Sequence, residues 1–300
     1  MQHRNDNMLL FIAIGDAVAA ATEYIDPRVY AQLIANTLRL DRYYQHPTHH
    51  KLKPGMYTDD TQMSIGVAEV LATPEYGQLH ATKLDFADAW TRVFHRNVRD
   101  GYARGFQAFL ETTKLGIEFM DRIKPASEKN GACMRAVPLG VIKDTKTLLE
   151  VATVQASTTH DTPIGIFSAQ AVALMSHFAL YRDDPFDRLQ DFLEIHLPNT
   201  ILLHQMNLHR RWHGPVKSPA TNTVHAVFDL LTHSSTLSEV LRGAIQFGGD
   251  TDSVASIALG IASTRMPNDL PQVLFDKLEN GPYGRDYLKT LGAQLMHTYA

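Results

Sequence analysis

The chain has 300 residues, of which 44% are hydrophobic and 20% charged, a composition typical of a folded globular protein. Its formal net charge of -4 provides no overall basic field for binding a phosphate backbone, so nucleic acid is not expected as the main partner. The single cysteine, Cys133, excludes an internal disulfide framework and any metal site built from several cysteines.

The N-terminal segment does not have the pattern of a leader or a membrane anchor. Residues 1–7 are polar, and the apolar run at residues 8–14 is too short to span a bilayer before Asp16 interrupts it. No small-residue cleavage site follows a basic leader, so no signal peptide is expected. The expected location is therefore the cytoplasm, with no membrane partner.

Two segments in the first third of the chain have the apolar spacing of amphipathic helices. Over residues 61–71, apolar side chains three and four positions apart share one face, and the pattern stops before Pro74. Residues 84–94 repeat this spacing with Phe86 and Trp90. Both segments are predicted to be helices.

The middle of the chain predicts two consecutive helices separated by a short break. Residues 151–158 and 164–178 form a nearly continuous helical pattern, interrupted around residues 159–162. Pro163 suits the first turn of the second helix, where a missing N–H costs nothing.

Residues 253–263 differ from these helices because small side chains face nearly every direction. A helix that is apolar all round is normally buried, so this segment is predicted to be a central helix. No convincing alternating strand is found, and the polar stretch 41–53 is interpreted as an exposed loop. Because no strong domain boundary appears, the sequence predicts one all-α domain over residues 1–300.

Two acidic clusters stand directly before predicted helices, at residues 58–61 and 248–253. One carboxylate at a helix start is an ordinary cap, whereas two repel each other and one cap cannot satisfy both. If these helix starts are buried, the charges must be paired or bound to a cation. Carboxylate and hydroxyl oxygens suit Mg²⁺, Mn²⁺ or Ca²⁺. Capping with solvation remains the alternative for each cluster taken alone.

Two further segments, around Asp16 and at residues 130–140, contain residue patterns that either a functional site or helix packing would explain. Asp16 follows Gly15 within the apolar N-terminal run and should lie near the core, where either a role in a charged site or a salt bridge with an arginine would explain it. Residues 130–140 have glycines near both ends and small residues between them. This suits either a close approach of backbone to a ligand or a turn between helices.

Taken together, these segments resemble the ADP-ribosylglycohydrolases, a family that includes the dinitrogenase reductase-activating glycohydrolase and the ADP-ribosyl-arginine and ADP-ribosyl-serine hydrolases. The resemblance is carried, in family order, by Gly15-Asp16-Ala17 with Glu23, Thr58-Asp59-Asp60-Thr61, Asn130-Gly131-Ala132-Cys133-Met134-Arg135, Thr159-His160 and Gly248-Gly249-Asp250-Thr251-Asp252. These motifs span about residues 10–265, and residues 266–300 carry none.

The resemblance implies a compact orthogonal helical bundle with a cleft for two Mg²⁺ ions, with Mn²⁺ as the alternative. The metal ligands that it implies are Thr58, Asp59, Asp60, Asp250, Asp252 and Ser253. The catalytic acids or bases that it implies are Asp59, Asp60 and Glu23. The chain departs from the family at Ser253, where a threonine is general, and at Ala19, where a glycine is common.

The resemblance also implies contacts with ADP-ribose from Gly101, Tyr102, Ser127, Asn130, Gly131 and His160. Taken from the residues alone, Tyr102 fits a packed aromatic side chain equally well. His160 fits equally well a residue that fixes the helix break before Pro163.

The implied function is magnesium-dependent hydrolysis of an N- or O-glycosidic bond between ADP-ribose and a modified partner, either a protein side chain or a small molecule. Two alternatives stay open. The departures at Ala19 and Ser253 permit an inactive ADP-ribose-binding or structural relative. The acidic clusters alone also permit a two-metal phosphohydrolase acting on a pyrophosphate.

Overall fold

The computed structural model describes residues 6–73, 81–217 and 219–299. Over these ranges the secondary structure consists of fifteen α-helices and several short 3-10 turns, with two isolated bridges and no strand. The predicted all-α class is confirmed.

The connections between successive α-helices range from a few residues to the long segments 38–58 and 123–144. The α-helices are α1 (Met8–Ala19), α2 (Ala31–Thr37), α3 (Asp59–Ala72), α4 (Lys83–Arg96), α5 (Arg104–Glu111), α6 (Gly116–Arg122), α7 (Thr145–Ser157), α8 (Pro163–Tyr181), α9 (Leu189–His196), α10 (Thr200–Met206), α11 (Ala220–His233), α12 (Leu237–Phe247), α13 (Thr251–Ala262), α14 (Gln272–Asp276) and α15 (Arg285–Thr298). The 3-10 turns are η1 (Ala20–Thr22), η3 (Asn130–Ala132), η4 (Val137–Val141) and η5 (Phe186–Arg188).

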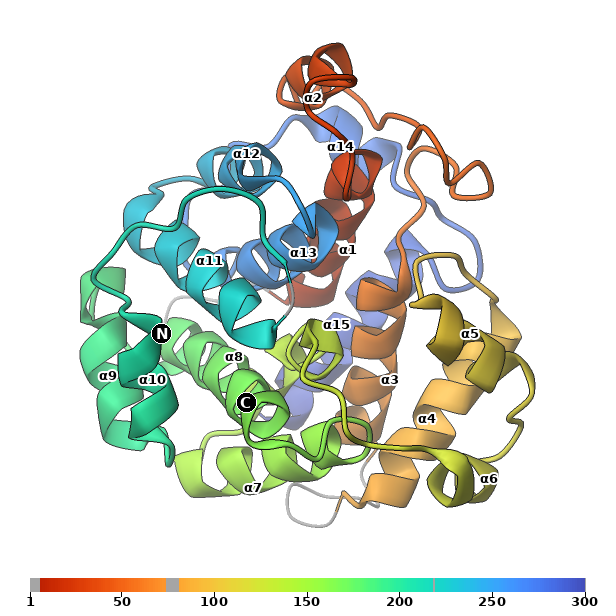
Figure 1. Cartoon of the computed structure of the whole chain (residues 1–300), viewed down its shortest axis with the longest axis vertical. Helices are drawn as coiled ribbons and strands as arrows, with labels where there is room; N and C mark the ends of the chain where they lie inside the picture. Colours follow the sequence, from red (N-terminus) through yellow and green to blue (C-terminus); the bar gives the residue numbers. More distant parts are fainter. Residues whose placement is uncertain (1–5, 74–80, 218, 300) are drawn as a thin grey trace.

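Helices α1 and α13 lie side by side in the middle of the molecule (Figure 1). Every residue of both helices is buried. Gly15 makes their close approach possible, because a Cβ atom there would lie 2.5 Å from the carbonyl oxygen of Ala255. The prediction that the small-residue segment forms a central helix is confirmed, and the helix begins at Thr251, two residues before the predicted segment.

The helices predicted at residues 61–71 and 84–94 are α3 and α4, which pack against each other. Helix α3 begins earlier than predicted because the Thr58 hydroxyl accepts a hydrogen bond from the Asp60 N–H at 3.4 Å. Helix α4 begins at a capping box of Thr82 and Asp85. Pro74, which was expected to limit the first helix, lies outside the described residues.

The helical break predicted before Pro163 is also confirmed. Helix α7 starts after Asp144, whose carboxylate accepts the Thr147 N–H at 2.8 Å. Helix α8 begins at Pro163 behind the Thr162 cap. Helix α8 is long and apolar enough to cross a membrane, but 83% of its most apolar window is buried inside the protein, as in a core helix.

The segment at residues 41–53 has no helix or strand, as predicted for a loop, but its expected exposure is wrong for several side chains. Tyr43, His46 and Leu52 are buried. The Tyr43 hydroxyl donates to the carbonyl oxygen of Leu274 at 2.6 Å. Apolar rings and hydrogen bonds to distant backbone therefore hold the loop against the protein.

Candidate metal and ligand site

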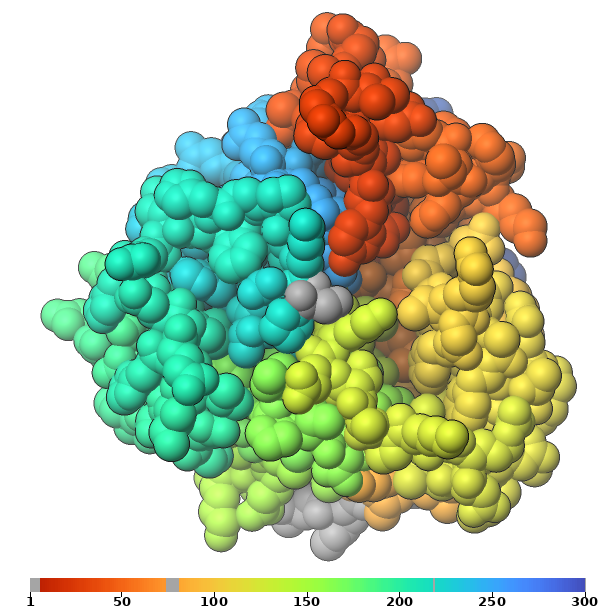
Figure 2. All heavy atoms as spheres, in the orientation of Figure 1, coloured from red at the N-terminus to blue at the C-terminus, as the bar shows by residue number. Residues whose placement is uncertain are grey.

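A cavity of about 340 Å³ opens where the segment after α1, the start of α3, the loop before α5, η3 and the start of α13 meet. The surface is hollowed between these segments in Figure 2. Most of the residues singled out in the sequence line it: Glu23, Asp59, Asp60, Gly101, Ser127, Asn130, Gly131, His160, Asp250, Asp252 and Ser253. Thr58 and Tyr102 do not.

The first acidic cluster lies at the N-terminus of α3. Asp59 and Asp60 occupy the first turn, behind Thr58 as the cap. The buried Asp60 carboxylate accepts the Ser256 hydroxyl from α13 at 3.3 Å. Gly101, in the loop before α5, has a φ of 118°, and a Cβ atom there would lie 2.4 Å from Asp59 Oδ1. This loop can therefore pack against Asp59 only with glycine at position 101.

The second acidic cluster lies at the N-terminus of α13, behind a tight turn. Gly248 and Gly249 have φ values of 73° and 76°. The turn is fixed by Val216, whose N–H donates to Gly248 and whose carbonyl accepts from Asp250, at 2.9 and 3.0 Å. This turn directs the Asp250 side chain into the cavity, while Asp252 lies one residue into the buried first turn.

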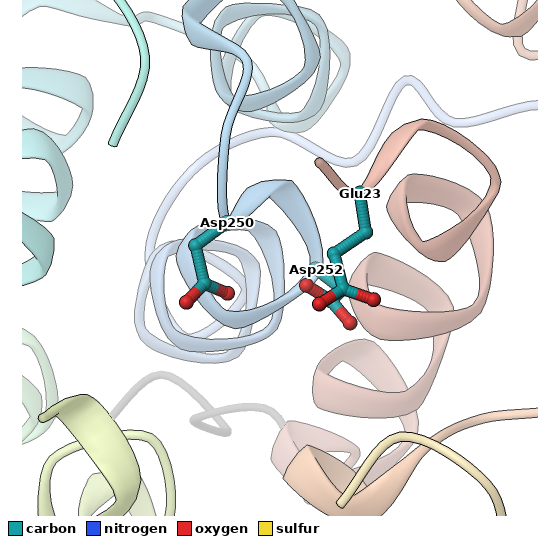
Figure 3. A group of neighbouring side chains, drawn as sticks. All are labelled: Glu23, Asp250 and Asp252. Atoms are coloured by element: carbon teal, nitrogen blue, oxygen red, sulfur yellow. The ribbon is translucent and has the colours of Figure 1, made fainter. Parts of the chain in front are cut away.

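Glu23 joins this second cluster from the segment that follows α1. The carbonyl of Ala19 accepts the hydroxyls of Thr22 and Thr251 at 3.0 and 2.9 Å, which ties the end of α1 to the start of α13. Carboxylate oxygens of Glu23, Asp250 and Asp252 lie within 4.8 Å of one another, and Figure 3 shows the three groups converging.

Two neutral groups orient the Asp250 carboxylate. Its Oδ2 atom accepts the Tyr24 hydroxyl at 3.0 Å and the Asn130 side-chain amide at 2.9 Å. Asn130 therefore connects the glycine-containing segment at η3 to the acidic cluster. Tyr24 is held in turn by its backbone N–H, which donates to the Gly249 carbonyl at 2.8 Å.

Asp16 does not line the cavity and is fully buried in α1. Its carboxylate accepts the Thr58 N–H at 2.9 Å, the Thr61 N–H at 3.1 Å and the Thr61 hydroxyl at 2.6 Å. The alternative of a salt bridge with an arginine is wrong for the described part of the chain, where no arginine pairs with Asp16. Burial raises the pKa of Asp16 to about 6, despite the hydrogen bonds from Thr61 and Thr58.

The acidic groups of the cavity raise one another's pKa. Burial, followed by the charge of Asp250, raises the pKa of Glu23 to about 8. Burial, followed by the charge of Asp16, raises the pKa of Asp59 to about 8. The pKa values of Asp60 and Asp252 also lie well above the usual range, first because of burial and then because of neighbouring carboxylates.

Such a donor set fits a hard divalent cation. No ion pair between described residues includes any of the five cavity carboxylates. Buried carboxylates without a cationic partner are costly, and oxygen donors are the ligands that Mg²⁺ and Mn²⁺ prefer. The carboxylate oxygens of the cavity therefore suit the Mg²⁺ or Mn²⁺ ions that the family resemblance implies.

The structure places Thr58 and Tyr102 beside the cavity rather than in its wall. The Thr58 hydroxyl faces Asp60 at 3.5 Å, and its backbone N–H is held by Asp16. Tyr102 is buried, donates to Gln62 Oε1 at 2.7 Å and packs against Phe94. Tyr102 thus has the surroundings of a packed aromatic side chain, which the sequence had left as its alternative.

Sequence reasoning missed several residues of the cavity: Tyr24, Ala103, Phe106, Ile123, Lys124, Lys129, Met134, Arg135 and Thr159. Six of these had a signal. Tyr24, Ala103 and Lys129 each adjoin a predicted site residue, and Met134, Arg135 and Thr159 lie within quoted motifs. Phe106, Ile123 and Lys124 had none, since only the folded chain brings them to the cavity.

The chain is similar to known proteins over nearly its whole length. The family model described as ADP-ribosylglycohydrolase matches residues 3–300. The chain is 24% identical over 288 residues to the ADP-ribosyl-[dinitrogen reductase] glycohydrolase of Rhodospirillum rubrum, covering 90% of this chain and 88% of the relative. A solved structure titled "ADP-ribosylglycohydrolase-related protein complex" has a TM-score of 0.74 and 22% identity, covering 100% of this chain and 99% of the other. The chain belongs to the ADP-ribosylglycohydrolase family.

Proposed function

We propose that this protein is a magnesium-dependent hydrolase that cleaves the glycosidic bond between ADP-ribose and a modified partner. The observation that carries this proposal is the convergence of carboxylates from three distant segments in one cavity. The relative from Rhodospirillum rubrum, named as a glycohydrolase of ADP-ribosyl-[dinitrogen reductase], supports the class of substrate.

Two Mg²⁺ ions, or Mn²⁺ in their place, would be held by the oxygens of the two helix starts. The proposed ligands are Asp59, Asp60, Asp250, Asp252 and Ser253 in the cavity wall, together with Thr58, the cap of α3 beside them. When bound, such ions polarise oxygen ligands and lower the pKa of a bound water molecule. Glu23 lies close enough to Asp250 and Asp252 to serve as a further ligand.

The reaction breaks a C–N or C–O bond at the anomeric carbon of the ribose, and water supplies a hydroxyl to that carbon and a proton to the leaving group. Positive charge develops on the sugar as the bond breaks. The acidic wall stabilises this charge, and Asp59, Asp60 or Glu23 accepts the proton of water or donates one to the leaving group. Ser127, Asn130, Gly131 and His160, which line the same cavity, bind and orient the ADP-ribose.

The decisive experiment removes single charges from the two clusters. Asp60→Asn and Asp252→Asn keep the size of each side chain but remove the anionic oxygen, so release of ADP-ribose from arginine-linked or serine-linked peptides should fall at least ~10²-fold. Asp121→Asn changes an exposed residue of α6 and should leave turnover unchanged. Wild-type turnover in either cluster variant with Mg²⁺ would contradict the proposal, as would full activity of the wild type in EDTA.

Product analysis separates this reaction from the alternatives. Intact ADP-ribose is expected as the released product. AMP with ribose phosphate would instead identify a pyrophosphate-cleaving enzyme. Binding of free ADP-ribose without release from either peptide or from small-molecule conjugates would identify an inactive relative.

A further inference from the structure

Arg135 is a buried cation at the edge of the cavity. It is 1% exposed, and its guanidinium carbon lies 3.7 Å from the ring centroid of Trp90. Its Nε atom donates to Gln155 Oε1 at 2.9 Å, and the Gln155 amide donates to the Ala132 carbonyl at 3.0 Å. Ring stacking and this hydrogen bond fix the plane and the direction of the guanidinium.

The guanidinium is linked to His160 through one hydroxyl group. Arg135 donates from a terminal nitrogen to Thr159 Oγ1 at 2.7 Å, and the same oxygen lies 2.7 Å from His160 Nδ1. A guanidinium can only donate, so Thr159 Oγ1 accepts from it and keeps its own proton for another acceptor. Nδ1 of His160 is the acceptor that lies within reach, which leaves the ring proton on Nε2.

The Nε2 side of the His160 ring faces the cavity wall at Gly131. A Cβ atom at Gly131 would lie 3.1 Å from Nε2 and 2.9 Å from Cε1, so any side chain at residue 131 would crowd this edge of the ring. His160 lines the cavity, and Nε2 has no hydrogen-bond partner among the described residues. Burial, together with the charge of Arg135, lowers the pKa of His160 to about 3, so the ring stays neutral.

We propose that Arg135 and Thr159 are positioning residues that hold His160 in the Nε2–H tautomer, so that the ring presents one neutral hydrogen-bond donor to an oxygen atom of the bound ligand. The identity of this ligand as ADP-ribose rests on the proposed function. Because donor and tautomer are fixed before binding, no reorganisation is needed when the ligand arrives.

This arrangement also determines which ligand atoms can form a hydrogen bond with His160. A ring with hydrogen on Nε2 and an occupied Nδ1 can donate to a phosphate, hydroxyl or ring oxygen but cannot accept from a ligand N–H. Nε of Arg135 donates to Gln155, and one terminal nitrogen donates to Thr159. The hydrogen-bonded path from Arg135 to the His160 ring therefore runs through the Thr159 hydroxyl.

The test removes the linking hydroxyl. In the wild type, ¹⁵N NMR of histidine-labelled protein, with the signals assigned against His160→Gln, should show the proton on Nε2 and an accepted hydrogen bond at Nδ1. Thr159→Val should abolish the Nδ1 signature and weaken the binding of free ADP-ribose about tenfold, the loss of roughly one hydrogen bond. Thr159→Ser should restore both.

The matched control is Thr158→Val, which removes a neighbouring buried hydroxyl that bonds only to the Val154 carbonyl at 2.8 Å. It should change neither the His160 signals nor the affinity. A proton on Nδ1 in the wild type would overturn the proposal, even if Thr159→Val failed to fold. An unchanged Nδ1 signal or unchanged affinity in folded Thr159→Val would do so as well. Failure of the wild type to release ADP-ribose would instead refute the proposed function, while the tautomer assignment would stand.

Discussion

Asp16 shows how a single residue supports the site without lining it. Its buried carboxylate accepts two backbone N–H groups and one hydroxyl at the start of α3. These bonds satisfy donors that every helix leaves unpaired in its first turn. Asp16 thereby joins the central helix α1 to the turn that carries Asp59 and Asp60, and it fixes where those two carboxylates stand.

Replacing Asp16 by asparagine should destabilise the protein. An amide offers one acceptor oxygen, and its NH₂ group would face donors at Thr58 and Thr61. A buried group left unsatisfied costs about 1–3 kcal/mol, and chemical denaturation should show a loss of unfolding free energy of that size. The exposed control Asp121→Asn should lose less than about 0.5 kcal/mol. Equal stability of the two variants would contradict this role.

Among the elements, the pairing of α1 and α13 sets the geometry of the acidic site. Glu23 follows α1 and Asp252 lies in the first turn of α13, so any shift between these helices changes the distance between the two carboxylates. The two helices approach closely at Gly15, because the backbone of α13 lies where a side chain at residue 15 would be.

The change Gly15→Ala should therefore force the two helices apart. Its Cβ atom would meet backbone at 2.5 Å, and overpacking of this kind costs about 1–3 kcal/mol. Gly105→Ala is the control, since no atom lies within 4 Å of its Cβ and alanine favours helix α5 by up to about 1 kcal/mol. Thermal unfolding should give opposite shifts for the two variants, and a Gly15→Ala protein as stable as the wild type would refute close packing here.

At the scale of the whole molecule, the fold concentrates negative charge in one buried place. The pKa values of Glu23 and Asp59 are raised to about 8, so the folded protein without metal binds protons that the unfolded chain has released. A carboxyl group whose pKa is raised by folding contributes stability at low pH, and this contribution is lost as the pH rises through the pKa of the folded state.

Without divalent ions, the protein should become less stable between pH 7 and pH 9. In this range the histidines with lowered pKa, such as His160 and His177, are neutral in the folded state and mostly neutral in the unfolded state, so their opposing slope is small. Calorimetry in EDTA should show a falling Tm, and Mg²⁺ should restore it most strongly at pH 9. Asp252→Asn should reduce the Mg²⁺ effect. If the Tm in EDTA rose between pH 7 and pH 9, the acidic cluster could not be the group that controls stability in this range.

The amino-acid sequence was sufficient to predict the helical class, the central small-residue helix and the start of α8 at Pro163. Helical periodicity depends on residues three or four positions apart, and proline suits the first turn of a helix. The two acidic clusters and Glu23 also marked all five carboxylates that line the cavity.

Which of these residues come into contact depends on the packing of distant segments. Glu23 joins Asp250 and Asp252 across more than two hundred positions, and Tyr102 turns into the aromatic interior instead of the cavity. The hydrogen-bonded path from Arg135 to His160 likewise depends on how η3 packs beside the end of α7. Such contacts arise from packing between distant segments, and no local propensity in the sequence encodes them.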